Sequence, residues 1–145
     1  MSFHSSLISD AVWPADIRTA LGLSSGSVYV GRRPQNVPVK DVEVLILRGE
    51  VDQRGAGLGH EVEIHPYELH VRMRTNAGGD RTGKAQQTTV EAHLRTLVDR
   101  YHGLRPFVAT LTDLVAVQAR EGDVDLDPTD EATLVGVVQV DFLVR

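Results

Sequence analysis

Apolar residues follow a two-residue period in several parts of the chain, which is typical of strands with one buried face. The clearest case covers residues 134–144, where one face holds Leu134, Gly136, Val138, Val140, Phe142 and Val144. Residues 42–48 are instead apolar on both faces, with Val44 and Ile46 on one and Leu45 and Leu47 on the other. This second pattern predicts a strand inside a sheet rather than at its edge.

Three more segments have the character of strands: residues 27–30, 60–75 and 113–119. In the longest of them, the apolar positions are even before Pro66 and odd after it. A change of face at a proline predicts a β-bulge or kink at that residue. The strands on either side of Gly55 should pair as an extended hairpin.

The helical period is most regular after Thr88. Thr88 and Glu91 have the spacing of a capping box, and Gly103 ends the pattern in the position typical of a helix C-terminus. The apolar stripe of this helix contains Val90, Leu94, Leu97, Val98 and Tyr101. The segment therefore predicts an amphipathic helix whose apolar side packs on a sheet.

Shorter helical segments are predicted elsewhere. The N-terminal region should form one helix up to about Val12 and a second over residues 14–21, which Gly22 ends. Residues 107–111 have the pattern of a helical turn. The predicted loops are residues 31–40, 49–59, 76–87 and 121–130. We expect the loop over residues 76–87 to be mobile, because it has almost no hydrophobic content, and the last loop is acidic.

The order of these elements predicts an α+β fold. We expect a mostly antiparallel sheet with two main helices packed on one face, long mobile loops, and a single domain over residues 1–145. Two short helices cover only one face of such a sheet well. Since residues 42–48 and 134–144 are apolar on both faces, the uncovered face is a candidate contact with a neighbouring subunit.

Composition agrees with one globular domain and excludes several classes of function. The chain has 145 residues, of which 41% are hydrophobic and 24% charged, and a net charge of −5. An acidic protein is not a general binder of nucleic acid, because that affinity comes mainly from phosphate neutralisation. The chain has no cysteine, which excludes disulfides, thiolate metal sites and a cysteine nucleophile. No apolar run approaches a membrane span, and the N-terminus has no pattern of a secretory signal.

Two glycine-rich strings resemble nucleotide-binding motifs only in part. Residues 78–84 match G-x-x-x-x-G-K, but Ala85 stands where a serine or threonine should hold magnesium. The predicted helix start at Thr88 is also too far from Lys84 for a phosphate loop. Residues 55–59 precede a strand rather than a helix, so their glycines are explained by a turn. We therefore expect no nucleotide cofactor.

The histidines and carboxylates form no spacing that is typical of a metal site. His60, His65 and His70 are five residues apart, and on a strand His65 points away from the other two. Asp123, Asp125, Asp127 and Asp130 lie in one predicted loop, and the first three have the 1, 3, 5 spacing of a calcium loop, but the glycine and glutamate that such a loop needs are missing. No serine has the neighbours of a nucleophile. The sequence predicts no catalytic residue, no metal and no enzyme activity.

Basic residues gather around the long polar loop. The candidate interface residues are Arg32, Arg33, Arg72, Arg74, Arg81 and Lys84. Arg72 and Arg74 alternate on one face of their strand and lead into the loop. A small basic patch at the base of the loop is one interpretation, and separately solvated side chains are the other.

The order of elements over the whole chain resembles the tail terminator (tail completion) proteins of long-tailed bacteriophages. An opening helix leads to a short strand ending at Gly31, a long hairpin, a long polar loop, a capped helix and the closing strand VGVVQVDFLVR. The resemblance rests on this order and on length, and carries over no individual residue.

The resemblance implies a structural protein of the virion. It implies a ring, typically of six copies, that caps the head-proximal end of the tail tube. Its partners would be other copies of itself, the tail tube protein and a neck or head-completion protein. DNA would pass through the channel without sequence-specific binding, and no membrane would be involved. Three alternatives remain: a neck adaptor that joins head and tail, a small α+β enzyme or ligand-binding domain, and an oligomeric adaptor that does not belong to a phage.

Overall fold

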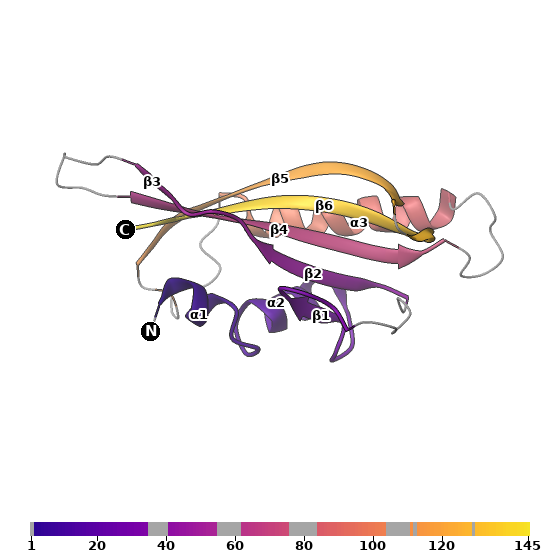
Figure 1. Cartoon of the computed structure of the whole chain (residues 1–145), viewed down its shortest axis with the longest axis horizontal. Helices are drawn as coiled ribbons and strands as arrows, with labels where there is room; N and C mark the ends of the chain where they lie inside the picture. The colour runs from indigo at the N-terminus through magenta and orange to yellow at the C-terminus, as the bar shows by residue number, and fades with distance from the viewer. Residues whose placement is uncertain are drawn as a thin grey trace.

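The computed structural model describes residues 2–34, 41–54, 62–75, 84–103, 111, 113–128 and 130–145. The helices in this part of the chain are α1 (Phe3–Leu7), α2 (Trp13–Leu21) and α3 (Lys84–Tyr101). Its strands are β1 (Val28–Val30), β2 (Glu43–Arg48), β3 (Asp52–Arg54), β4 (Val62–Arg74), β5 (Leu114–Asp127) and β6 (Asp130–Val144). Figure 1 shows them as one long, twisted sheet with helices beside it, which confirms the predicted α+β fold.

The strands pair in the order β1-β2-β4-β6-β5, and β3 pairs with β4 beyond the end of β2. β1 is parallel to β2, and the other described pairs are antiparallel. The predictions of a mostly antiparallel sheet and of an internal strand at residues 42–48 are therefore confirmed. β1 and β5 are the strands at the two ends of this order, so they are the edge strands of the sheet.

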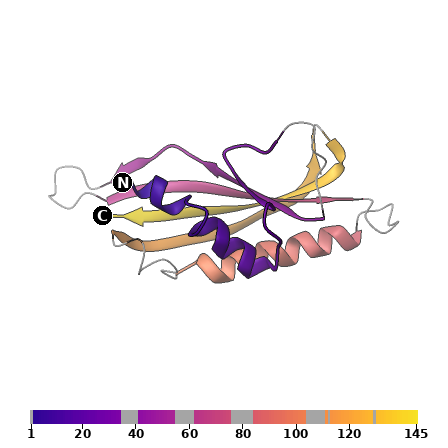
Figure 2. The same cartoon turned by 90° about the horizontal axis from the view of Figure 1, so that it is seen from below.

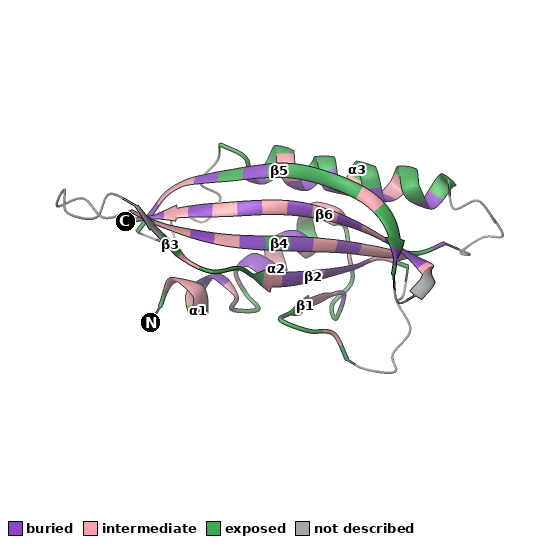
Figure 3. Ribbon diagram, turned by 45° about the horizontal axis from the view of Figure 1, so that its top comes forward, coloured by how far each residue is buried: buried purple, intermediate pink, exposed green. Residues whose placement is uncertain are grey.

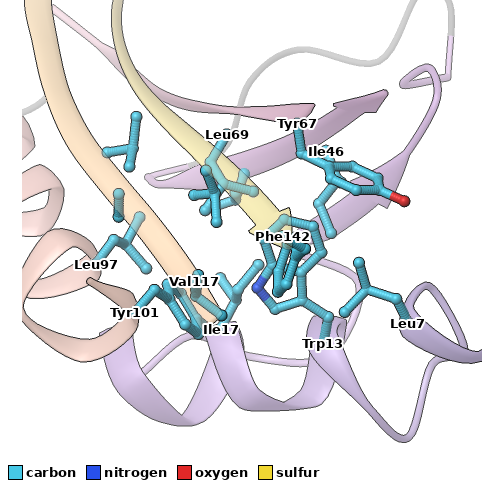
Figure 4. Close-up of a cluster of buried hydrophobic side chains, with 14 of the residues drawn as sticks. Leu7, Trp13, Ile17, Ile46, Tyr67, Leu69, Leu97, Tyr101, Val117 and Phe142 are labelled. Atoms are coloured by element: carbon cyan, nitrogen blue, oxygen red, sulfur yellow. The ribbon is translucent and has the colours of Figure 1, made fainter. Parts of the chain in front are cut away.

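All three described helices pack on the same face of the sheet (Figure 2). The core between helices and sheet centres on four fully buried aromatic residues, Trp13, Tyr67, Tyr101 and Phe142. Figure 4 shows Trp13 beside Phe142, with Ile17 and Leu97 nearby. The apolar face that the sequence predicts for residues 134–144 is the face that lies on this core.

Gly136 lets α3 approach the sheet closely. A Cβ atom at this position would lie 2.8 Å from both Leu94 Cδ1 and Val90 Cγ1. A larger residue would therefore push α3 away from β6. This contact explains why a glycine interrupts the apolar face of a buried strand.

The predicted bulge at Pro66 is wrong. β4 pairs with β6 without a shift from Glu63 to Arg74. The irregularity lies in the neighbouring chain, where the register with β4 moves by one residue between β2 and β3. Pro66 accepts a hydrogen bond from the Gly49 N–H at 2.8 Å but has no N–H to donate in return. The backbone hydrogen bonding of β4 with β2 and β3 is therefore interrupted at Pro66. The pairing of β4 with β6 stays regular.

The last predicted helix begins earlier than expected. α3 starts at Lys84, so the end of the predicted loop over residues 76–87 is helical. Thr88 lies inside the helix, where its hydroxyl donates to the Lys84 carbonyl at 3.1 Å, and the predicted capping box is wrong. Alanine, lysine and glutamine favour helices, and Gln86 is buried one turn before Val90. The burial of Gln86 and the helix propensity of these residues together extend the helix toward its N-terminus, beyond the apolar stripe.

The predicted acidic loop over residues 121–130 is wrong as well. β5 continues through it to Asp127, twice as long as the strand predicted over residues 113–119. β5 is an edge strand, and Arg120, Glu121, Asp123 and Asp125 lie exposed beside register shifts in its pairing with β6, whereas Asp127 at its end is buried. Exposed charges and bulges are common on edge strands because they hinder pairing with other chains.

Several smaller predictions are confirmed and others lie outside the described residues. Gly22 caps α2 in the left-handed conformation, with φ 67°. β1 and β2 lie where strands are predicted. Residues 55–60, 76–83 and 107–110 lie outside the described part of the chain. Within the described part, no helix has the length and apolar character to cross a membrane.

Candidate interaction surface

The face of the sheet opposite the helices is here called the open face. Figure 3 shows its strands in front, with α2 and α3 behind them. Paired residues of neighbouring strands point to the same face, and Leu45, His70 and Val137 form one such row. The half-buried apolar residues of the open face include Tyr29, Leu45, Leu47, Val62, Ile64, Pro66, Ala116, Val135, Val137 and Leu143. The described helices leave this partly apolar surface uncovered.

Polar residues on the open face contact one another. His70 Nε2 lies 2.8 Å from Glu68 Oε2, and Gln139 Nε2 donates to Asp141 Oδ1 at 2.9 Å. A hollow of about 330 Å³ is lined by Leu47 and Pro66 together with Glu68 and Gln139. A mixture of apolar and polar side chains of this kind is typical of a protein contact.

A row of alternating charges crosses the sheet at the end where β2 begins. Arg33 donates through Nε and Nη2 to both carboxylate oxygens of Glu43, at 2.9 and 3.0 Å. Arg72 lies opposite Glu43 in the register of β2 and β4. Arg72 Nη2 then donates to Asp127 Oδ2 at 2.6 Å. Both carboxylates are buried. The contacts of this row connect the segment after β1 with β2, β4 and β5.

The structure places the six candidate interface residues in different surroundings. It places Arg33 and Arg72 in the charged row, where they contact buried carboxylates. Arg32 is exposed just after β1, Arg74 is exposed at the end of β4, Lys84 begins α3, and Arg81 lies outside the described residues. Sequence reasoning missed Glu43, and it considered Asp127 only as part of a calcium-like spacing, not as the partner of Arg72. One signal was present, since Glu43 is the acidic residue in the otherwise apolar run VEVLIL.

The described residues contain no group of three His, Asp or Glu side chains that could hold a metal ion. His65 is buried against Phe3 at a ring distance of 4.9 Å, whereas His70 lies on the open face. For the G-x-x-x-x-G-K string, the predicted gap before the helix is wrong, because α3 starts at Lys84. Ala85 still lacks the magnesium hydroxyl, and β4 is flanked by antiparallel strands rather than the parallel ones of a phosphate loop.

An ionic contact on the helix side fixes α2 to α3. Arg100 forms a two-pronged ion pair with Asp16, and its Nε lies 2.6 Å from Asp16 Oδ2. The Tyr101 hydroxyl donates to the same oxygen at 2.7 Å. Burial, together with the nearby carboxylate, raises the pKa of the Tyr101 hydroxyl. These groups serve the packing of the two helices.

The short helix α1 is held against the sheet by aromatic contacts. Phe3 packs on Phe142 at a ring distance of 5.6 Å, and His4 Nδ1 lies 2.8 Å from the Tyr67 hydroxyl. Burial lowers the pKa of His4, and the charges of Arg48 and His65 lower it further. Burial also raises the pKa of Tyr67 to about 12. The contact between α1 and the sheet thus favours uncharged side chains.

We expect the protein to lose stability below neutral pH. Burial lowers the pKa of His93 as well, so both His4 and His93 bind protons less readily when folded than at the ordinary value of 6.5. The stabilisation is complete above that value and decreases as pH falls, because the unfolded chain then binds more protons. Urea unfolding at about pH 7 and about pH 5 measures the difference, which His4→Gln should reduce. An identical pH dependence in that variant would contradict the assignment to His4.

Comparisons with known proteins find a likeness in fold. No model of a protein family matches the chain, and no curated protein is similar to it in sequence. Among solved structures, it is similar to a chain in the virion of a native gene transfer agent (GTA) particle. The two chains are 15% identical with a TM-score of 0.54, over 97% of this chain and 90% of the other. The shared fold extends over almost the whole length of both chains.

Proposed function

We propose that this protein is a structural subunit of a phage or phage-like virion. The observation that carries the proposal is the similarity of fold to a chain of a GTA virion, which covers 97% of this chain. Such particles are built from subunits that bind one another, so a partly apolar face free of described helices fits this role. The described residues hold no group of three His, Asp or Glu side chains that could bind a metal ion.

Within the virion, we propose a ring that caps the head-proximal end of the tail tube and joins it to the neck. The order of elements resembles that of tail terminator proteins, which implies a ring of six copies. The subunit is elongated, with both termini near one end of the sheet and the turn between β5 and β6 at the other (Figure 1). These two ends suit contacts with different partners, the tail tube protein and a neck protein. A net charge of −5 would weaken the adhesion of DNA that passes through the ring.

The first test is the native mass of the purified protein. Light scattering over a concentration series should show a closed oligomer whose mass stops increasing, and electron microscopy should show rings. The second test removes the gene from the particle's genome. Loss of a cap should leave tail tubes of irregular length, because nothing then ends their polymerisation. Tails of normal length that are detached from heads would favour a neck adaptor, and unchanged particles would contradict a structural role.

A further inference from the structure

The two edges of the sheet carry exposed apolar side chains. Val30 at the end of β1 is 38% exposed and Leu126 near the end of β5 is 47% exposed. They are the large hydrophobic side chains with the greatest exposure among the described residues. Single exposed apolar residues are common, but these two mark opposite edges of one sheet.

Val30 and Leu126 also project on the same side of the sheet. Val30 pairs with Ile46, and Leu126 pairs with Leu134. Ile46 and Leu134 both face the helix-bearing core, and directly paired residues share a face. If the β1 edge of one copy lies beside the β5 edge of another, the two exposed side chains are on the same side of the combined sheet.

The charges of the two edges are complementary. Glu121, Asp123 and Asp125 are exposed on β5 and outnumber the exposed Arg120. Arg32 is exposed directly after β1. Two β5 edges placed together would bring carboxylates against carboxylates, which is unfavourable. A β1 edge against a β5 edge brings opposite charges together.

We infer that neighbouring copies of this protein bind through opposite sheet edges, β1 of one copy against β5 of the next. The inference rests on the proposed ring and assigns its subunit contact. Because the two surfaces differ, the contact is head-to-tail, which is the geometry that closes into a ring. Side chains rather than a continuous backbone ladder form it, since β5 is interrupted by register shifts and charges.

Cross-linking tests the direction of the contact. The natural chain has no cysteine, so introduced thiols are unique. The double variant Val30→Cys with Leu126→Cys, treated with a short bismaleimide, should give a ladder of covalent oligomers that ends at the native mass. Neither single variant should form covalent dimers, but a mixture of the two should. Dimers from either single variant would overturn the inference, because they require a two-fold contact.

Charge reversal tests whether the opposite charges of the two edges contribute to the contact between copies. Arg32→Glu should raise the concentration at which half of the protein is assembled by about tenfold, and so should Asp123→Arg. Combining them should restore assembly, since the pair is again opposite in charge. Arg145→Glu is the matched control, because Arg145 is exposed after β6, an internal strand, and this variant should leave assembly unchanged. Equal effects from Arg32→Glu and Arg145→Glu would contradict the assignment.

The outcomes for the ring and for its contact are distinct. Rings whose edge cysteines do not cross-link, and whose assembly ignores the charge reversals, would overturn the edge contact and leave the proposed function standing. A wild-type protein that stays monomeric at every concentration, and whose removal leaves particles unchanged, would overturn both.

Discussion

Replacing Trp13 by alanine should lower the free energy of unfolding by about 3–5 kcal/mol, the range for a large aromatic residue removed from a core. Trp13 is fully buried. Its ring lies 5.0 Å from Phe142, 5.2 Å from Tyr67 and 6.0 Å from Tyr101, edge to face in each case. The residue thus joins α2 to β4, β6 and α3, and alanine would leave a cavity where these elements meet.

Urea unfolding followed by circular dichroism measures this loss, because the variant lacks the one tryptophan of the chain. Tyr29→Ala is the control: Tyr29 is a half-buried aromatic residue on the open face, and its removal should cost about 1 kcal/mol or less. Equal losses in the two variants would contradict the placement of α2 on the sheet.

Replacing Arg33 by alanine should destabilise the protein by about 2–4 kcal/mol, because it removes the two-pronged donor of a buried carboxylate. The Glu43 side chain is 2% exposed and that of Arg33 is 19% exposed. In the variant, water can reach the position of Arg33 and solvate Glu43. The loss of stability should therefore be smaller than for a fully buried ion pair. Arg33→Lys should recover only part of the stability, since an ammonium group cannot bind both oxygens in the planar geometry of arginine.

Arg18→Ala is the matched control for this prediction. The Arg18 side chain is also 19% exposed, but its partner Asp10 is 87% exposed. Pairs with so exposed a carboxylate contribute about 1 kcal/mol or less, so this variant should unfold at nearly the wild-type urea concentration. If Arg18→Ala lowered the free energy of unfolding as much as Arg33→Ala, the burial of Glu43 would not be the reason for the destabilisation.

Local pattern predicted the apolar faces more reliably than the ends of elements. The alternation over residues 134–144 identified the buried side of β6, including Gly136. At Pro66 the same alternation was misread, because Val62 and Ile64 lie on the open face while the polar His65 lies on the buried one. A half-buried open face made both sides of β4 partly apolar, so hydrophobicity alone did not distinguish them.

The ends of α3 and β5 depended on contacts with distant parts of the chain. Gln86 is buried in the folded protein, which favours a helix that begins before the apolar stripe of α3. The acidic half of β5 is a strand because β6 pairs with it, although its own composition is typical of a loop. A strand can hold many charges at the edge of a sheet, since its outer side and any part of its faces that no helix covers remain in water.

For the candidate surface, the sequence identified the basic residues but not their partners. Arg72 binds Asp127, which lies 55 residues later, and no local spacing connects the two. By itself, the sequence determined the α+β class, the internal position of β2 and the core face of β6, because these follow from periodicity within single segments. Only the tertiary structure decided that β5 continues through the acidic segment and that Arg33 and Arg72 bind buried carboxylates. It also placed exposed apolar residues on opposite edges of the sheet, because such features depend on which segments the fold brings together.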